Sequence, residues 1–239
     1  MVTDADRNDG FDPAQFVDSS RFSVDAMFEE LVALAKSEIR DESLRQLVLI
    51  IYDRYGRQLR ELPASTKHAY IFRGGWLEHV LSLTKTCIFL ADHYATRFAE
   101  MTPKLNRDLV IAGALLHDIG RVLELSTESS VPQPTMSGKL FGYVVLGRDL
   151  VRDISRELGN VNPELLLLLE HLMLAHLALP ESALSRQPLI PEAVLLHHAD
   201  TLDGQMEMSM RCVSRDLGSG PFTARDPILG KALLKQRSV

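Results

Sequence analysis

Residues 109–120 read LVIAGALLHDIG, an apolar run that ends in an adjacent histidine and aspartate. Apolar residues fill every turn of this stretch, so we expect a buried helix from about residue 106 to 119. A buried carboxylate without a partner is strongly disfavoured. A divalent cation would satisfy His117 and Asp118 together, because imidazole nitrogen and carboxylate oxygen are both good ligands. The alternative is that Asp118 caps the helix and His117 packs in the core.

The same combination of apolar and ligand-type residues occurs twice more. Residues 76–81 read WLEHVL and place His79 in an apolar stretch, and residues 193–200 read AVLLHHAD and end in Asp200. His197 and Asp200 are three residues apart and share a helix face, so we expect His197 to position Asp200. Three separate helices would then each carry ligand-type groups toward one place.

The rest of the chain favours an all-α domain. After an acidic leader over residues 1–22, which we expect to be poorly ordered, a single domain over 23–239 ends in a basic helix. Helical periodicity, capping residues and prolines at first turns predict helices over about 23–35, 41–56, 75–98, 106–119, 141–158, 163–179, 191–213 and 226–236. A loop or small hairpin is expected around residues 123–140, which are rich in Ser, Thr and Pro.

Composition excludes several classes of protein. The chain has 239 residues, 46% of them hydrophobic and 24% charged, and its apolar runs are far shorter than a membrane span needs. The start of the chain is acidic, which is unlike a secretory signal, and its two cysteines have no CxxC partner. We therefore expect a reduced, cytoplasmic protein without a membrane partner.

The net charge of −6 offers no global basic field, although residues 211–239 contain six basic residues and two aspartates. That tail is either a solvated helix face or a phosphate-binding patch.

The order His79, His117-Asp118 and Asp200 resembles the HD superfamily of metal-dependent phosphohydrolases. The chain more closely resembles the HD domain of the YhaM-type 3′→5′ exoribonucleases, from about residue 12 to 237. The stretches that carry this resemblance are GGWLEH at 74–79, LVIAGALLHDIG at 109–120 and EAVLLHHAD at 192–200. The resemblance implies an HD-type helical bundle with phosphohydrolase activity of the phosphodiesterase or nucleotidase class.

The resemblance also implies the site residues. His79, His117, Asp118 and Asp200 would bind one divalent transition metal (Mn, Fe, Zn, Co or Ni). Asp118 would also orient the attacking water, and Arg121 would assist catalysis. Phosphate would be bound by His68, Arg73 and Arg121.

Family members with two metals supply further histidines, and this chain departs from them at two positions. Tyr143 and Leu177 stand where those members have histidine. Leucine cannot bind a metal, and a neutral tyrosine is a poor ligand at pH 7. His171 and His176 remain as possible ligands, so we expect a second metal site to be absent or weak.

Three functions stay open at this point. The first is hydrolysis of a phosphoester in a nucleotide or short oligonucleotide. The second is a YhaM-like exoribonuclease acting on single-stranded RNA, although those proteins carry an N-terminal OB domain for which we expect no room in 239 residues. The third is a degenerate HD domain that binds a metal or nucleotide without turnover. A homo-oligomer is compatible with each of them.

Overall fold

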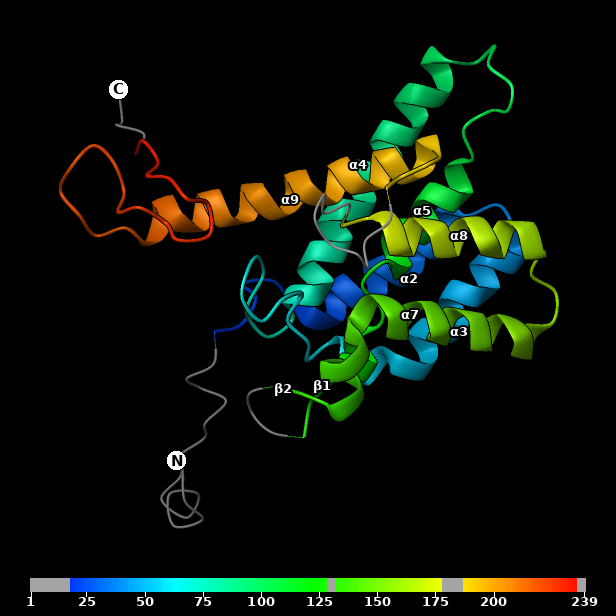
Figure 1. The fold of residues 1–239 in the computed structure, drawn as a ribbon, viewed down its shortest axis with the longest axis horizontal. Helices are drawn as coiled ribbons and strands as arrows, with labels where there is room; N and C mark the ends of the chain where they lie inside the picture. The colour runs from blue at the N-terminus through cyan, green and yellow to red at the C-terminus, as the bar shows by residue number, and fades with distance from the viewer. Residues whose placement is uncertain (1–17, 129–131, 178–186, 236–239) are drawn as a thin grey trace.

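The computed structural model describes residues 18–128, 132–177 and 187–235. These residues form a helical bundle with one small hairpin, which confirms the predicted fold class (Figure 1). In chain order the elements are α2 (Val24–Glu38), α3 (Glu42–Leu59), α4 (Gly75–Arg97), α5 (Arg107–Leu116), α6 (Arg121–Glu124), β1 (Leu125–Ser126), β2 (Gln133–Pro134), α7 (Met136–Leu158), α8 (Pro163–Ala175) and α9 (Pro191–Arg215).

Helix α5 is the centre of the bundle. Its residues from Leu109 to Leu116 are all buried, and the helix contacts α2, α3, α4, α8 and α9. Gly113 allows α8 and α9 to approach closely, because a Cβ atom there would lie 2.6 Å from Leu172 Cδ2. Burial on every side explains why the sequence of α5 is apolar all round rather than amphipathic.

Two buried aromatic side chains hold the C-terminal end of α5. The Tyr52 hydroxyl donates to the carbonyl oxygen of Leu115 at 2.9 Å, and Trp76 Nε1 donates to that of Asp118 at 3.1 Å. Both rings are fully buried. Carbonyl groups at the end of a helix have no partner within the helix, so these bonds satisfy them and fix the chain where His117 and Asp118 emerge.

Side-chain caps explain where several helices begin. The residues before α2, α3, α5, α7 and α8 each accept a hydrogen bond from a backbone N–H of the first turn; they are Ser23, Asp41, Asn106, Thr135 and Asn162. Such residues are favoured at this position because they replace a missing intrahelical acceptor. Helix α8 ends at Ala175 rather than near residue 179, and residues 178 and 179 lie outside the described part of the chain.

The predicted hairpin is confirmed, and α7 starts earlier than expected. Leu125 and Ser126 pair with Pro134 and Gln133 in an antiparallel ladder. Helix α7 contains a kink at Gly142, whose φ of 71° is accessible to glycine but strained for other residues. The helix predicted from residue 141 therefore corresponds to the part of α7 that follows this kink.

The prediction of a basic C-terminal helix over 226–236 is wrong for the described residues of that range. Residues 227–229 form a turn, in which the Asp226 side chain accepts from the backbone N–H groups of Ile228 and Leu229. Gly230 then adopts a φ of 66°, and the returning chain pairs Leu234 with Phe222. An Asx-turn followed by a left-handed glycine favours reversal of the chain over helix continuation.

Helix α9 crosses α4, and its C-terminal half extends away from the body of the bundle (Figure 1). Residues 1–17 of the predicted leader lie outside the described residues, but Asp18 and Ser20 exchange backbone hydrogen bonds with Arg73. The last residues of the predicted leader thus lie beside the segment that precedes α4. No helix within the described residues is both long and apolar enough to cross a membrane.

Candidate metal centre

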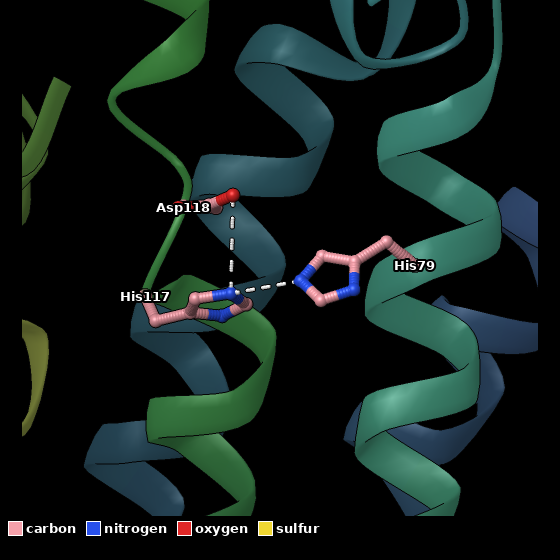
Figure 2. A group of neighbouring side chains, drawn as sticks. All are labelled: His79, His117 and Asp118. Carbon is pink, nitrogen blue, oxygen red and sulfur yellow. Dashed lines mark hydrogen bonds and ion pairs between the residues drawn. The ribbon is translucent and has the colours of Figure 1, made fainter. Parts of the chain in front are cut away.

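Four ligand-type side chains converge between α4, the end of α5 and α9. His79 Nε2 lies 3.2 Å from His117 Nε2 and 3.3 Å from Asp200 Oδ1. His117 Nε2 lies 3.9 Å from Asp118 Oδ2 and 4.0 Å from Asp200 Oδ1. Figure 2 shows His79, His117 and Asp118, whose ligand atoms all lie within 4.8 Å of one another. The structure thus places all four predicted ligands together, although they come from three parts of the chain.

The second nitrogen of each histidine fixes how its ring is oriented. His117 Nδ1 donates to the carbonyl oxygen of Ala114 at 2.9 Å, and His79 Nδ1 donates to Asp203 Oδ2 at 2.8 Å. Carbonyl and carboxylate oxygens only accept, so each Nδ1 carries a proton. The Nε2 atoms are then the candidate ligand atoms, and both point toward the cluster, where that of His79 lies 3.3 Å from Asp200 Oδ1. Hydrogen-bonded imidazoles of this kind are typical of metal sites in proteins.

The carboxylates of the cluster fit a cation. Asp118 is buried, and its Oδ1 atom has no hydrogen-bond partner among the described residues. Burial opposes its charge, but the neighbouring His117 and Arg121 hold the pKa of Asp118 below its usual value. Burial opposes the charge of Asp200 as well, but the hydrogen bond from His79 and the nearby imidazoles of His117 and His176 together lower its pKa. Two ionised carboxylates and two imidazole nitrogens form a donor set that suits a divalent transition metal.

The two histidines differ in how readily they take up a proton. Burial lowers the pKa of His117 to about 4. Burial also opposes the charge of His79, but hydrogen bonds to Asp200 and Asp203 outweigh it and raise its pKa to about 10. His79 is therefore the position at which a proton would compete with a metal ion.

The sequence analysis gave no role to Asp203, Ser82 or Tyr70. These residues hold His79 in place on the side away from His117 through direct contacts or through one another. Asp203 binds His79, and its other carboxylate oxygen accepts from the Ser82 hydroxyl at 2.5 Å. The Tyr70 ring packs against His79, with the two centroids 5.3 Å apart. The spacing of Asp200 and Asp203, three residues apart on one helix, could have indicated that both face α4.

His171 and His176, the possible ligands of a second metal, lie in two separate places. His176 lies beside the cluster, with Nε2 3.7 Å from Asp118 Oδ1, whereas His171 Nε2 accepts from the backbone N–H of Leu189. Helix positions five residues apart point about 140° from each other, so these two histidines cannot converge on one ion. Of the two possible ligands of a second metal, only His176 lies beside the cluster.

Both ring nitrogens of His176 already have hydrogen-bond partners. Its Nδ1 donates to the carbonyl oxygen of Met173 at 2.7 Å, and its Nε2 lies 3.3 Å from the Tyr143 hydroxyl. Burial raises the pKa of Tyr143 well above its usual value, so the hydroxyl keeps its proton and donates it to Nε2. The one nitrogen that could bind a second ion thus accepts a hydrogen bond instead.

Comparison with known proteins agrees with this arrangement. Residues 76–205, more than half of the chain, match the HD domain family. The chain belongs to the HD-domain family. Similar proteins include the 3′-5′ exoribonuclease YhaM of Bacillus licheniformis, which is 32% identical over 188 residues, and that of Listeria innocua, which is 29% identical over 225 residues. The matched region covers 79% of this chain and 56% of the Bacillus protein, and 94% of this chain and 68% of the Listeria protein. No solved structure gives a significant match.

Three basic residues were predicted to bind phosphate in this HD domain, and one lies at the cluster. Arg121 Nε is 3.9 Å from Asp118 Oδ2. His68 is exposed, and its carbonyl oxygen accepts from Arg211. Both carboxylate oxygens of Glu61 bind the guanidinium of Arg73. The contacts of these last two residues give their predicted role no support.

His197 has a different role from the one expected in the HD domain. Its Nδ1 donates to the carbonyl oxygen of His176 at 2.6 Å. The expectation that it positions Asp200 is wrong, because its ring faces the end of α8 rather than the next turn of α9. His197 instead fixes the turn that carries His176.

Proposed function

We propose that this protein is a metal-dependent phosphohydrolase that cleaves a phosphoester in a nucleotide or short oligonucleotide. The observation that carries the proposal is the cluster of His79, His117, Asp118 and Asp200, in which both imidazoles turn their Nε2 atoms toward the carboxylates. These residues would hold one divalent transition metal. The HD-domain family of the chain supports the same assignment.

The residues of the cluster divide the work of hydrolysis. A divalent ion supplies a Lewis acid that lowers the pKa of water and polarises the phosphoryl oxygens. Asp118 Oδ1 is buried and accepts no hydrogen bond from the described part of the chain, so it can accept a proton from the attacking water and orient that water toward phosphorus. Asp203 keeps the proton of His79 on Nδ1 and so preserves the ligand atom.

Arg121 is the group best placed to receive the phosphate. Its guanidinium lies next to Asp118, and its side chain is 12% exposed, so an anion there would be largely removed from water. Electrostatic interactions are stronger in such a site than at the surface. Arg121 would bind a phosphoryl oxygen and offset the charge that develops during displacement.

The basic tail gives little support for binding a long nucleic acid. Arg215 pairs with Asp18, Lys235 with Asp216, and Arg211 with the His68 carbonyl oxygen and Glu207. A groove for single strands needs free basic groups and aromatic platforms for stacking. We therefore favour small substrates over long RNA.

A second candidate, a YhaM-like 3′→5′ exoribonuclease, is favoured by the similar proteins. Those of Listeria innocua and Geobacillus are matched over 68% and 71% of their length, and that of Bacillus licheniformis over 56%. The remaining parts of these proteins lie outside the region that matches this chain. Processive degradation of RNA would thus require that the domain binds a strand by itself or with a further segment.

The first experiment measures metal content and hydrolysis in parallel. Purified protein with added Mn²⁺ is tested on nucleoside monophosphates, dinucleotides and a single-stranded RNA of about 20 nucleotides. Asp118→Ala should lose both metal and activity, while Asp153→Ala, which removes an exposed carboxylate paired with Arg156, should retain both. Unaltered metal content in Asp118→Ala would contradict the ligand assignment. Processive shortening of the RNA, with the small substrates left intact, would favour the exoribonuclease.

A further inference from the structure

The structure assigns Tyr143 as the positioning residue for Arg121, whose guanidinium lies beside Asp118. The Tyr143 ring would hold this cation beside Asp118, where it binds a phosphoryl oxygen of the substrate. This inference rests on the proposed function for the identity of the substrate, but the binding of an anion at Arg121 can be measured without turnover.

Three contacts hold the Arg121 guanidinium. Its Cζ atom lies 3.6 Å from the centroid of the Tyr143 ring, and its Nη1 atom donates to Glu124 Oε2 at 2.5 Å. Its Nε atom lies 3.9 Å from Asp118 Oδ2, too far for a hydrogen bond. A cation over an aromatic face is attracted by the ring quadrupole, and more strongly where water is excluded.

One donor of this guanidinium is left unused. Arg121 Nε is buried and has no hydrogen-bond partner among the described residues. Asp118 Oδ1 is in the same situation. A buried donor without a partner costs about 1–3 kcal/mol, so native structures rarely leave one without a ligand or function. A phosphoryl oxygen close to Arg121 would supply the missing acceptor.

The backbone brings the ring over the guanidinium in two ways. Gly142, with its φ of 71°, turns the chain immediately before Tyr143. Gly120 lets α7 approach the turn before α6, since a Cβ atom there would lie 1.9 Å from the carbonyl oxygen of Tyr143. Arg121 follows Gly120 directly, so this close backbone contact fixes the distance between the side chains of Arg121 and Tyr143.

The same ring keeps a second ion out. The Tyr143 hydroxyl donates to His176 Nε2, which lies 3.7 Å from Asp118 Oδ1 directly after α8. A guanidinium cannot activate water as a metal does, but it is always charged and can donate two hydrogen bonds to one phosphate. Tyr143 thus occupies the imidazole nitrogen that a second ion would need, and it also holds a permanent cation beside Asp118.

The test is a double-mutant cycle on phosphate binding. The affinity of the metal-loaded protein for inorganic phosphate is measured by calorimetry for the wild type, Tyr143→Leu, Arg121→Gln and the double variant. Tyr143→Leu should weaken phosphate binding by about tenfold, within the range of a desolvated cation–π contact. In the Arg121→Gln background the same change should have no further effect. Phosphate affinity is compared at one bound metal ion per chain, because Tyr143→Leu frees His176 Nε2.

Two additional variants separate the ring from general structural damage. Tyr143→Phe keeps the ring and should recover most of the affinity that Tyr143→Leu loses. Phe141→Leu removes an exposed aromatic residue two positions away on α7 and should bind phosphate as the wild type does. If Tyr143→Leu does not fold, the comparison of Arg121→Lys with Arg121→Gln replaces it: lysine keeps the charge but loses the planar contact, so it should fail to restore wild-type affinity.

The inference is overturned if Tyr143→Leu and Tyr143→Phe bind phosphate equally weakly, because the hydroxyl would then matter rather than the ring. Additive effects in the cycle would overturn it too. A protein that cleaves no phosphoester but shows the predicted coupling in phosphate binding would contradict the proposed function and leave this inference standing.

Discussion

The Nδ1 atom of His79 lies 2.8 Å from Oδ2 of Asp203, a residue 124 positions further along the chain. This contact links α4 to α9 and determines which nitrogen of His79 faces the other ligands. The second carboxylate oxygen of Asp203 accepts from Ser82, one turn after His79 on the same helix. Asp203 is thus held at two points and holds the ring rigidly.

We expect Asp203→Asn to weaken metal binding by about 10- to 100-fold, since removing the partner of a metal-binding histidine has effects of this size. An asparagine can still fill the space but brings no charge to raise the basicity of His79. The measurement is a competition with a chelator of known affinity. Asp153→Asn, on the exposed face of α7, serves as the control. Equal affinities of the two variants would contradict the positioning role of Asp203.

Metal binding should release a proton and strengthen as pH rises. The pKa of His79 is raised from 6.5 to about 10 in the metal-free fold, so at neutral pH a metal ion must displace its proton. Apparent affinity should increase by up to about tenfold per pH unit between about pH 6 and 8. Calorimetry in buffers of different ionisation enthalpy measures the proton release. A pH-independent affinity would show that His79 is neutral before the metal binds.

The stability of the metal-free protein should change in the opposite direction. A pKa raised on folding contributes stability that is fully present below pH 6.5 and is lost as pH rises through about 10. The free energy of unfolding should therefore fall over this range after chelation, and the fall should be smaller in His79→Gln. Denaturant titrations at several pH values test this. An identical pH dependence in the two proteins would contradict the assigned pKa.

We expect about one metal ion per chain, because Tyr143 occupies His176 and His171 lies elsewhere. Tyr143 and Leu177 stand where two-metal members of the family have histidine. The double variant Tyr143→His, Leu177→His should therefore raise the metal content toward two ions per chain. Each single variant is the control for the pair. Elemental analysis of the purified proteins decides the matter. Two tightly bound ions in the wild type would mean that His176 exchanges its hydrogen bond for a metal.

Gly120 should tolerate no side chain. Alanine there would place a Cβ atom 1.9 Å from the Tyr143 carbonyl oxygen, so α7 would have to move, and we expect a loss of about 3 kcal/mol or more in unfolding free energy. Gly204 on α9 is the matched control, with its nearest atom 3.7 Å away. Gly204→Ala should raise stability by about 0.5 to 1 kcal/mol, as expected for alanine within a helix. Thermal unfolding of both variants tests the contrast.

The sequence alone predicted most of the helices and the set of candidate metal ligands. Apolar periodicity and caps such as Asp41 and Asn106 are local features, and they predicted the helical bundle because helix formation depends on neighbours three and four residues away. The candidate ligands His79, His117 and Asp118 could be proposed because charged or polar groups in apolar helices need a partner. That pattern can be read from the sequence without a structure.

Only the tertiary structure decided which side chains meet across helices. The bond between His79 and Asp203, the ring of Tyr143 over Arg121, and the separation of His171 from His176 depend on helix rotation and on close backbone contacts at single glycines. Helical periodicity also did not predict the chain reversal at Gly230, because the turn depends on one side-chain acceptor and one backbone angle. Distances between residues remote in sequence are set by packing, and spacing along the chain does not contain them.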